Sequence, residues 1–117
     1  MKISIVTTCL NSEKSIAFTL SSVFSQTYKN IEHIIIDGGS TDETLNILKK
    51  HNVKKKIFIK KNTSIYEALN IGITKSSGQY ILVLNSDDIL NDNNVIKNVV
   101  NFIKKNNHKI ILGNVTY

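Results

Sequence analysis

The chain has 117 residues, of which 41% are hydrophobic and 21% charged, so its composition fits one globular domain, or part of one, and excludes a disordered chain. The formal net charge is +6, and all 15 basic residues are lysines. Without arginine the bidentate contacts to phosphate and guanine are missing, and the lysines do not interleave with aromatic residues, so nucleic-acid binding is disfavoured.

The first half of the chain alternates predicted strands and helices. Residues 2–8 are apolar and β-branched, which predicts a buried strand. Residues 13–26 carry apolar side chains at helical spacing, and residues 31–37 predict a second buried strand. Residues 40–43 have the S-x-x-E pattern of a capping box, so we expect a helix from there to about Lys50.

The second half continues the alternation. Residues 55–60 predict a third strand near a sheet edge, where lysines are tolerated. A second S-x-x-E capping box at residues 64–67 opens a helix, and residues 80–85 predict a fourth strand. Residues 92–103 repeat apolar side chains at helical spacing, and residues 109–115 predict a fifth, buried strand.

The alternation predicts an α/β fold with a doubly wound, mostly parallel sheet of about five strands and helices on both faces. No internal repeat or linker interrupts it, so residues 1–117 are interpreted as a single domain. The lysines between residues 49 and 61 are interpreted as a solvated face and edge strand rather than as a binding patch.

Ligands of open parallel sheets bind beyond the carboxyl ends of the strands. Residues 7–11, 37–40 and 85–88 follow the first, second and fourth predicted strands. They carry three of the nine acidic residues, at Asp37, Asp87 and Asp88, in a chain that is otherwise basic. Clustered carboxylates repel one another and usually persist for a ligand or a cation, and a hard divalent cation that also binds phosphate suits them.

Each candidate also has a structural interpretation. Asp37 can close an Asx-turn, and Asp87 and Asp88 can form a turn or a helix N-cap. Cys9 lies in the expected crevice, but no histidine is near it in sequence, so a small buried thiol is favoured over a nucleophile. The histidines lack metal-ligand spacing and are interpreted as structural or solvated; they are His33, His51 and His108.

Five segments, taken in order, resemble the N-terminal part of family 2 glycosyltransferases with the GT-A fold. They are residues 3–11 (ISIVTTCLN), 22–28 (SVFSQTY), 34–42 (IIIDGGSTD), 65–73 (IYEALNIGI) and 78–88 (GQYILVLNSDD). Each segment alone is moderately specific, but five in order are highly specific and cover nearly the whole chain. The resemblance implies a Rossmann-like sheet of the GT-A type.

The resemblance implies an inverting transfer of a sugar from a nucleotide diphosphate sugar, commonly a uridine diphosphate sugar, to an acceptor hydroxyl. Such enzymes often build surface polysaccharide or lipopolysaccharide. By analogy the donor is expected to contact Thr8, Leu10, Asn11, Asp37, Gly38, Tyr66, Asn70, Ser86 and Asp87. The family's D-x-D motif falls on residues 85–87, so Mn²⁺ or Mg²⁺ is expected to bind Asp87 with Asn85 and Asp88.

The sequence departs from the family pattern at three places. Asn85 is a neutral ligand where the motif begins with an acid, so we expect either a lower metal affinity or compensation by Asp88, and Gly38 replaces a common second Asp. The family's catalytic base lies well beyond the D-x-D motif, and the acid after Asp88, Asp92, is too close to serve. The catalytic residue is therefore unassigned, and we expect the N-terminal part of a longer enzyme with little activity alone.

The expected partners are a nucleotide-sugar donor and a saccharide or lipid-linked saccharide acceptor. No apolar run approaches the ~18 residues of a membrane span, so we expect a cytoplasmic protein, with the inner membrane face, peripheral membrane association and weak self-association left open.

A non-catalytic nucleotide-binding module is the main alternative. A phosphoacceptor receiver domain needs an acidic pair after its first strand, where this chain has residues 7–10 (TTCL), and a purely structural module would not gather its acids.

Overall fold

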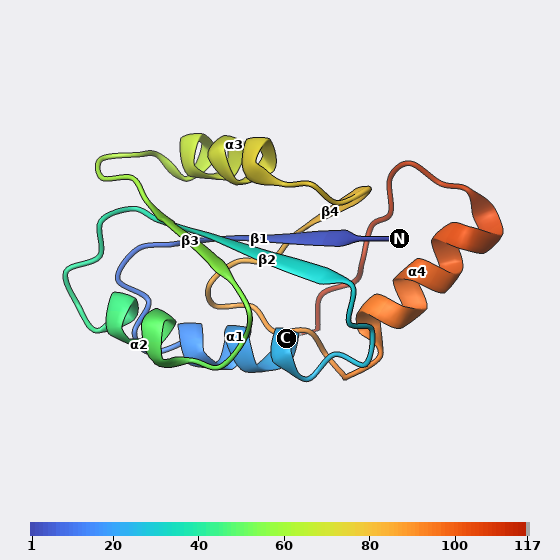
Figure 1. The fold of residues 1–117 in the computed structure, drawn as a ribbon, viewed down its shortest axis with the longest axis horizontal. Helices are drawn as coiled ribbons and strands as arrows, with labels where there is room; N and C mark the ends of the chain where they lie inside the picture. The colour runs from blue at the N-terminus through green and yellow to red at the C-terminus, as the bar shows by residue number, and fades with distance from the viewer. Residues whose placement is uncertain (117) are drawn as a thin grey trace.

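Four parallel strands form the centre of the computed structural model, which describes residues 1–116 (Figure 1). They lie in the order β3-β2-β1-β4. The strands are β1 (Ile3–Cys9), β2 (Ile31–Asp37), β3 (Lys56–Ile59) and β4 (Tyr80–Val83). The helices between and after them are α1 (Ile16–Phe24), α2 (Thr44–Lys50), α3 (Ile65–Lys75) and α4 (Val95–Asn106).

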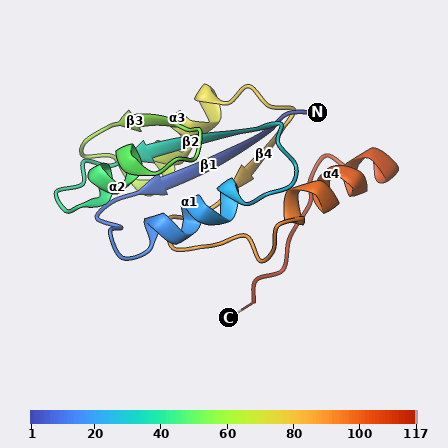
Figure 2. The same ribbon diagram turned by 60° about the horizontal axis from the view of Figure 1, so that its bottom comes forward.

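The helices cover both faces of the sheet. α3 lies on one face and α1 with α2 on the other, while α4 lies beyond the end of the sheet from which β1 starts (Figures 1 and 2). β2 supplies both layers of the core: Ile35 packs in the cluster that includes α1, and Ile34 and Ile36 pack with Ala68 of α3. This arrangement confirms the predicted doubly wound, parallel α/β fold.

The register of the strands opens a notch at one end of the sheet. β1 and β2 pair along their whole length, so that Cys9 lies opposite Asp37. β4 is shorter and stops at Val83, opposite Val6 of β1. The last residues of β1 therefore extend past the end of β4, and the chain after β4 runs beside them.

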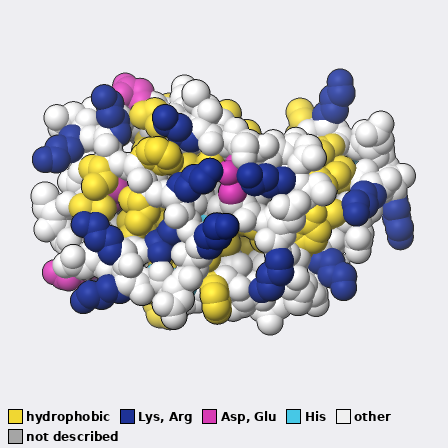
Figure 3. Space-filling model, in the orientation of Figure 1, with side chains coloured by type: hydrophobic (Ala, Val, Ile, Leu, Met, Phe, Trp, Pro, Cys, Tyr) yellow, Lys and Arg dark blue, Asp and Glu magenta, His cyan; other side chains and the backbone are white. Residues whose placement is uncertain are grey.

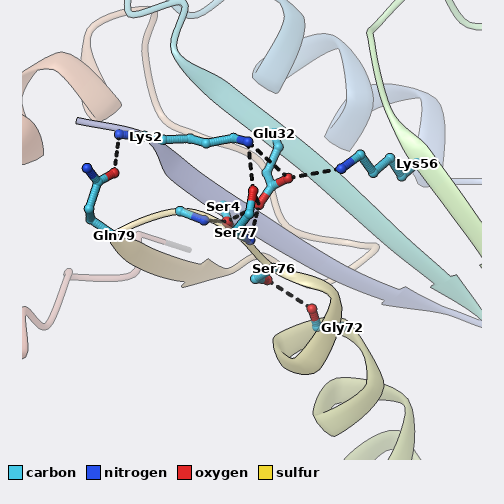
Figure 4. Close-up of polar contacts among 9 residues, drawn as sticks. Lys2, Ser4, Glu32, Lys56, Gly72, Ser76, Ser77 and Gln79 are labelled. Atoms are coloured by element: carbon cyan, nitrogen blue, oxygen red, sulfur yellow. Dashed lines mark hydrogen bonds and ion pairs between the residues drawn. The ribbon is translucent and has the colours of Figure 1, made fainter.

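At the opposite end of the sheet, Glu32 ties four segments together (Figure 4). Its Oε1 accepts hydrogen bonds from Ser4 Oγ at 2.5 Å and from Ser77 N at 2.5 Å. Its Oε2 lies 3.5 Å from Lys2 Nζ and 3.3 Å from Lys56 Nζ. Desolvation acts to raise the pKa of Glu32, but these hydrogen bonds lower it to about 2, so the carboxylate stays charged where the strands begin.

Two predictions about helix starts have different outcomes. In the second capping box Ser64 Oγ accepts from Glu67 N at 3.1 Å, and α3 begins at Ile65 as predicted. The first capping box is wrong: α2 begins at Thr44, whose N–H donates to Asp42 Oδ1 at 2.9 Å rather than to Ser40. Ser40 does not cap the helix, because its Oγ accepts from Asn11 N at 2.9 Å and donates to Asp37 Oδ2 at 2.6 Å.

The predicted fifth strand at residues 109–115 is also wrong. This segment pairs with no strand in the part of the chain that the structure describes, and it leaves α4 away from the sheet (Figure 2). Ile110 is 81% exposed and Leu112 91% exposed, so the segment is not buried either. Apolar, β-branched residues favour the strand conformation, but a strand also needs the free edge of another strand to hydrogen-bond with. The sheet therefore has four strands rather than five.

The lysines of β3 and α2 lie on a solvated edge of the molecule, as interpreted from the sequence. β3 is an edge strand, and Lys56 on it is exposed. Figure 3 shows lysine side chains spread over this whole face rather than gathered in one place. Within residues 1–116, no helix is long and apolar enough to cross a membrane.

Candidate functional site

Two adjoining hollows lie at the carboxyl ends of β1 and β4. The larger has a volume of about 640 Å³ and the smaller about 270 Å³. Both are lined by Thr8 of β1, Ser12, Ile65 of α3 and Ser86, so together they form one continuous cleft. The cleft occupies the notch that the short strand β4 leaves beside β1.

The cleft collects most of the residues predicted for donor binding. Its larger part is lined by Thr8, Asn11, Asn85, Ser86 and Asp87, and its smaller part by Thr8, Leu10, Gly38 and Ser86. Tyr66 and Asn70 line neither part: both are exposed on α3, and Tyr66 is 77% exposed. Asp88 is exposed at the rim, outside the lining of both hollows.

Asp37 lies beneath the cleft with its carboxylate turned into the protein. It is fully buried, and its Oδ1 accepts hydrogen bonds from Gly39 N at 2.8 Å and from Ser40 N at 2.7 Å. Its Oδ2 accepts from Ser40 Oγ at 2.6 Å and from Cys9 Sγ at 3.4 Å. Gly39 has a φ of 96°, which a side chain would rarely tolerate. Asp37 therefore closes the Asx-turn that shapes the cleft floor, and its contact with a nucleotide stays a prediction.

Asn11 joins the ends of β1 and β2 above this turn. It adopts a left-handed φ of 48°, and its N–H donates to Ser40 Oγ at 2.9 Å. Its Oδ1 accepts from Thr41 N at 2.8 Å. Nearby, desolvation acts to raise the pKa of Asp42, but hydrogen bonds from Thr44 and from Glu13 lower it overall. The rim of the larger hollow is therefore built by side chains that cross between the two strand ends.

The turn after β4 presents Asp87 to the larger hollow. Asp88 N donates to Asn85 O at 3.1 Å, and Asn85 Nδ2 donates to Asp88 Oδ2 at 3.1 Å, so the turn closes on itself. Asp87 is exposed on the cleft wall, and no hydrogen bond or ion pair engages its carboxylate among the described residues. Its oxygens are free to meet a ligand.

This turn fits a hard divalent cation that is held partly by a ligand. Residues 1–116 contain no group of three His, Cys, Asp or Glu side chains arranged to hold a metal. The turn does present the Asp87 carboxylate to the larger hollow, and it joins the amide of Asn85 to the carboxylate of Asp88 at the rim. Mg²⁺ and similar ions are commonly bound by one or two carboxylates, with phosphate oxygens and water completing the shell.

Cys9 and His33 are structural, as predicted from the sequence. Burial raises the pKa of the Cys9 thiol, as does the neighbouring Asp37 carboxylate, so the thiol stays protonated and is no nucleophile. His33 is buried on β2, with Nε2 2.9 Å from Thr7 Oγ1. Neither side chain offers a reactive group to the cleft.

Sequence reasoning missed a set of hydroxyls that hold the turn in place. Ser12 Oγ lies 3.0 Å from Ser86 Oγ, and Ser15 Oγ donates to Ser86 O at 2.9 Å. Thr19 Oγ1 lies 3.0 Å from the same carbonyl. The apolar spacing of residues 13–26 predicts the helix but not its polar face, on which Ser15, Thr19 and Ser22 recur at the same helical spacing. That second, polar periodicity is the signal that would have found them.

Comparison with known proteins bears on this site. The family model described as Glycosyl transferase family 2 matches residues 4–117. A glycosyltransferase of Haemophilus influenzae is 36% identical over 115 residues, covering 95% of this chain and 35% of the relative. The poly(ribitol-phosphate) beta-N-acetylglucosaminyltransferase TarP of Staphylococcus aureus is 34% identical over 118 residues, covering 96% of this chain and 36% of TarP. The chain thus spans about a third of the length of these relatives.

Solved structures share the fold. S. aureus TarS 1-349 in complex with UDP-GlcNAc superposes with a TM-score of 0.85 at 27% identity, covering 92% of this chain and 32% of TarS 1-349. The mannosyltransferase PcManGT from Pyrobaculum calidifontis, in complex with GDP-Man and Mn²⁺, superposes with a TM-score of 0.79. It is 16% identical and covers 87% of this chain and 32% of PcManGT, so it supports the fold alone.

Proposed function

The chain belongs to glycosyl transferase family 2, and on this premise we propose that its cleft binds a nucleotide diphosphate sugar, with uridine diphosphate as the nucleotide part. The observation that carries the proposal is the free carboxylate of Asp87 on the wall of the larger hollow, directly beyond the carboxyl ends of two parallel strands. Ligands of open α/β sheets bind at that position.

The two parts of the cleft suit the two ends of such a ligand. The smaller hollow has apolar walls at Leu10 and Ile65 with hydroxyls at Thr63 and Ser64, a lining that suits the flat, hydrogen-bonding ring of a base. The larger hollow contains Lys14 and Asp87. A lysine and a metal-binding carboxylate together suit a diphosphate, and the sugar would extend from it into open space.

A divalent cation would be held by Asp87, with Asn85 and Asp88 beside it in the same turn. When bound, Mn²⁺ or Mg²⁺ would neutralise the negative charge that develops on the leaving diphosphate. The role of the protein is to present Asp87 to the larger hollow, in the same turn as the hydrogen-bonded pair Asn85 and Asp88. Lys14 adds a positive charge on the other wall of the same hollow.

The relatives support a uridine diphosphate donor and an acceptor polymer that carries hydroxyl groups. TarS 1-349 has been solved with UDP-GlcNAc, and the name of TarP describes transfer of N-acetylglucosamine to poly(ribitol-phosphate). For this chain we propose the donor-binding part of an inverting enzyme that transfers a sugar to a hydroxyl of a surface polysaccharide or lipopolysaccharide, at the cytoplasmic face of the membrane.

The same chain is proposed to transfer sugar poorly when alone, which makes a nucleotide-binding module the second candidate function. Transfer needs a general base for the acceptor hydroxyl. Asp92 is the acid that follows Asp88, and its Oδ1 is engaged by Asn94 N at 2.7 Å. A donor-consumption assay with Mn²⁺ separates the two candidates, because rapid sugar transfer by this chain would exclude the binding module.

Calorimetric titration with uridine diphosphate, with and without Mn²⁺, tests the binding site. We expect Mn²⁺-dependent binding that Asp87→Asn weakens roughly tenfold or more, since the change removes a charged ligand with little change in shape. Lys97→Ala on the exposed face of α4 is the control and should bind like the wild type. The proposal fails if the wild-type chain does not bind, or if Asp87→Asn binds equally well.

A further inference from the structure

One face of α1 carries a row of polar side chains that continues just past the helix end. Its members are Ser15, Thr19, Ser22 and Gln26, spaced four, three and four residues apart, so they lie above one another on the helix surface. Thr19 and Gln26 are buried, with 0% and 1% of their surface exposed. Buried polar groups need partners, and these find theirs in the chain that follows β4.

Each member of the row binds the backbone of residues 86–96. Ser15 Oγ donates to Ser86 O at 2.9 Å. Thr19 Oγ1, with one proton to give, lies 3.0 Å from Ser86 O and 2.7 Å from Asp88 O. Ser22 Oγ accepts from Leu90 N at 3.1 Å. The contacts thus begin at the turn that lines the cleft and continue along the chain.

Gln26 completes the row at its far end. Its Nε2 donates to Asp92 O at 2.7 Å, and its Oε1 accepts from Ile96 N at 3.1 Å, next to the start of α4. The backbone groups bound before α4 belong to every second residue, at positions 86, 88, 90 and 92.

This row of polar side chains therefore supplies the hydrogen-bond partners that a neighbouring strand would otherwise give to the backbone. Residues 84–94 form neither helix nor strand, and their peptide groups would lack partners against α1 without these side chains. The carbonyls on both sides of Asp87, those of Ser86 and Asp88, are the ones held by Thr19. Fixing both fixes the direction in which the Asp87 side chain leaves the backbone.

We propose that Thr19, assisted by Ser15, is a positioning residue that aims the Asp87 carboxylate at the cation and diphosphate. This inference rests on the proposed function, because Thr19 is assigned a role in holding a cation and a diphosphate that it does not itself contact. Thr19 does not line the cleft, so it acts through the backbone of the turn. A role in general stability alone would weaken nucleotide binding whether or not a cation is present.

The test is the affinity for uridine diphosphate with and without Mn²⁺, measured by calorimetry on three variants. Thr19→Val removes the hydroxyl with little change in shape, and Thr19→Ser keeps it. Ser21→Ala on the exposed face of α1, where the hydroxyl contacts His51, is the matched control. We expect Thr19→Val to weaken Mn²⁺-dependent binding about three- to tenfold, with metal-free binding unchanged. Thr19→Ser and Ser21→Ala should match the wild type.

The outcomes separate this inference from the proposed function. Equal binding by Thr19→Val and wild type, or an equal loss with and without Mn²⁺, overturns the positioning role while the binding site stands. Absence of wild-type binding overturns the proposed function and this inference with it. If Thr19→Val does not fold, Ser15→Ala, which loses one hydrogen bond to Ser86 O, must show the same Mn²⁺-specific loss. An unchanged Mn²⁺-dependent affinity in Ser15→Ala overturns the inference.

Discussion

His33 is a buried histidine held neutral at the centre of the sheet. It lies on β2 with 1% of its surface exposed, and Nε2 contacts Thr7 Oγ1. Its Nδ1 has no hydrogen-bond partner among the residues that the structure describes. Burial lowers its pKa from 6.5 to about 4, and the nearby charges of Lys55 and His51 act in the same direction. Protonation of this ring therefore opposes folding.

This pKa shift predicts a loss of stability in mild acid. The unfolded ring binds a proton below pH 6.5 and the folded ring only below about pH 4, so the free energy of unfolding should fall as pH drops through that window. The full loss is about 3 kcal/mol. Urea unfolding at pH 7 and at pH 4.5 measures most of this loss, because pH 4.5 lies just above the folded pKa. His33→Gln should flatten the pH dependence, whereas the exposed control His108→Gln should not; an unchanged slope in His33→Gln would contradict the assignment.

Asp37 shows what sequence can and cannot predict for one residue. Its position at a strand end was predictable, because the apolar run of β2 stops there. The direction of its carboxylate was not, because the N–H groups of Gly39 and Ser40 and the thiol of Cys9 compete with any ligand for it. Asp87 has no such neighbours and stays exposed. Local hydrogen bonds of this kind decide which acid of a cluster faces the site.

Helix α3 approaches β1 closely through a glycine. A Cβ on Gly72 would lie 2.3 Å from Val6 Cγ1 and 3.5 Å from Ile36 Cγ1. On an exposed helix, Gly→Ala stabilises by up to about 1 kcal/mol. Here we expect Gly72→Ala to destabilise by about 1–3 kcal/mol, because the helix must move away from the sheet. Urea unfolding measures the change.

A double-mutant cycle supplies the control for this contact. Val6→Ala alone should destabilise by leaving a cavity, but it also removes the methyl group that meets the new Cβ. Val6→Ala combined with Gly72→Ala should therefore cost less than the sum of the single changes. Strict additivity, or a Gly72→Ala protein more stable than the wild type, would show that the close approach does not limit the packing of α3.

At the scale of elements, the apolar spacing of the sequence predicted the strands and helices that are buried in the core. It did not predict the features that depend on which other segment a residue contacts. The four strands of the sheet and the four helices lie where the apolar spacing indicated, because those side chains are buried in the observed core. The segment 109–115 has the same composition but lies against no sheet edge. The first capping box failed for a similar reason, since Ser40 Oγ accepts from Asn11 N instead of from the first turn of α2.

Over the whole molecule, the distribution of charge favours an anionic ligand. Lysines cover the face around β3 (Figure 3), and the net charge is +6. The cleft itself is mixed, with Lys14 beside Glu13, Asp42 and Asp87. On the proposed function, a positive surface would attract the diphosphate from a distance, and the acids at the site would require a cation to accept it. The long-range attraction and the proposed metal dependence would then arise in different parts of the same surface.

The exposed apolar side chains at one end of the molecule predict self-association. Ile110 and Leu112 are among the most exposed apolar residues, and the edge strand β4 leaves Ile81 42% and Val83 46% exposed. Exposed apolar groups beside an unpaired strand edge favour contact between copies. Light scattering over a range of concentrations should show a mass that rises above the 13.1 kDa of the monomer.

Charged substitutions in this segment should reverse that association. Ile110→Lys combined with Leu112→Lys places charge where two copies would meet, and neither side chain contributes to the buried core, so the fold should be kept. Phe18→Lys is the control, because Phe18 is also apolar and is 69% exposed, but it belongs to α1 rather than to this segment. The mass of the double variant should stay at the monomer value while that of Phe18→Lys follows the wild type. A wild-type chain that remains monomeric at high concentration would contradict the prediction, and equal association by all three proteins would place the contact elsewhere.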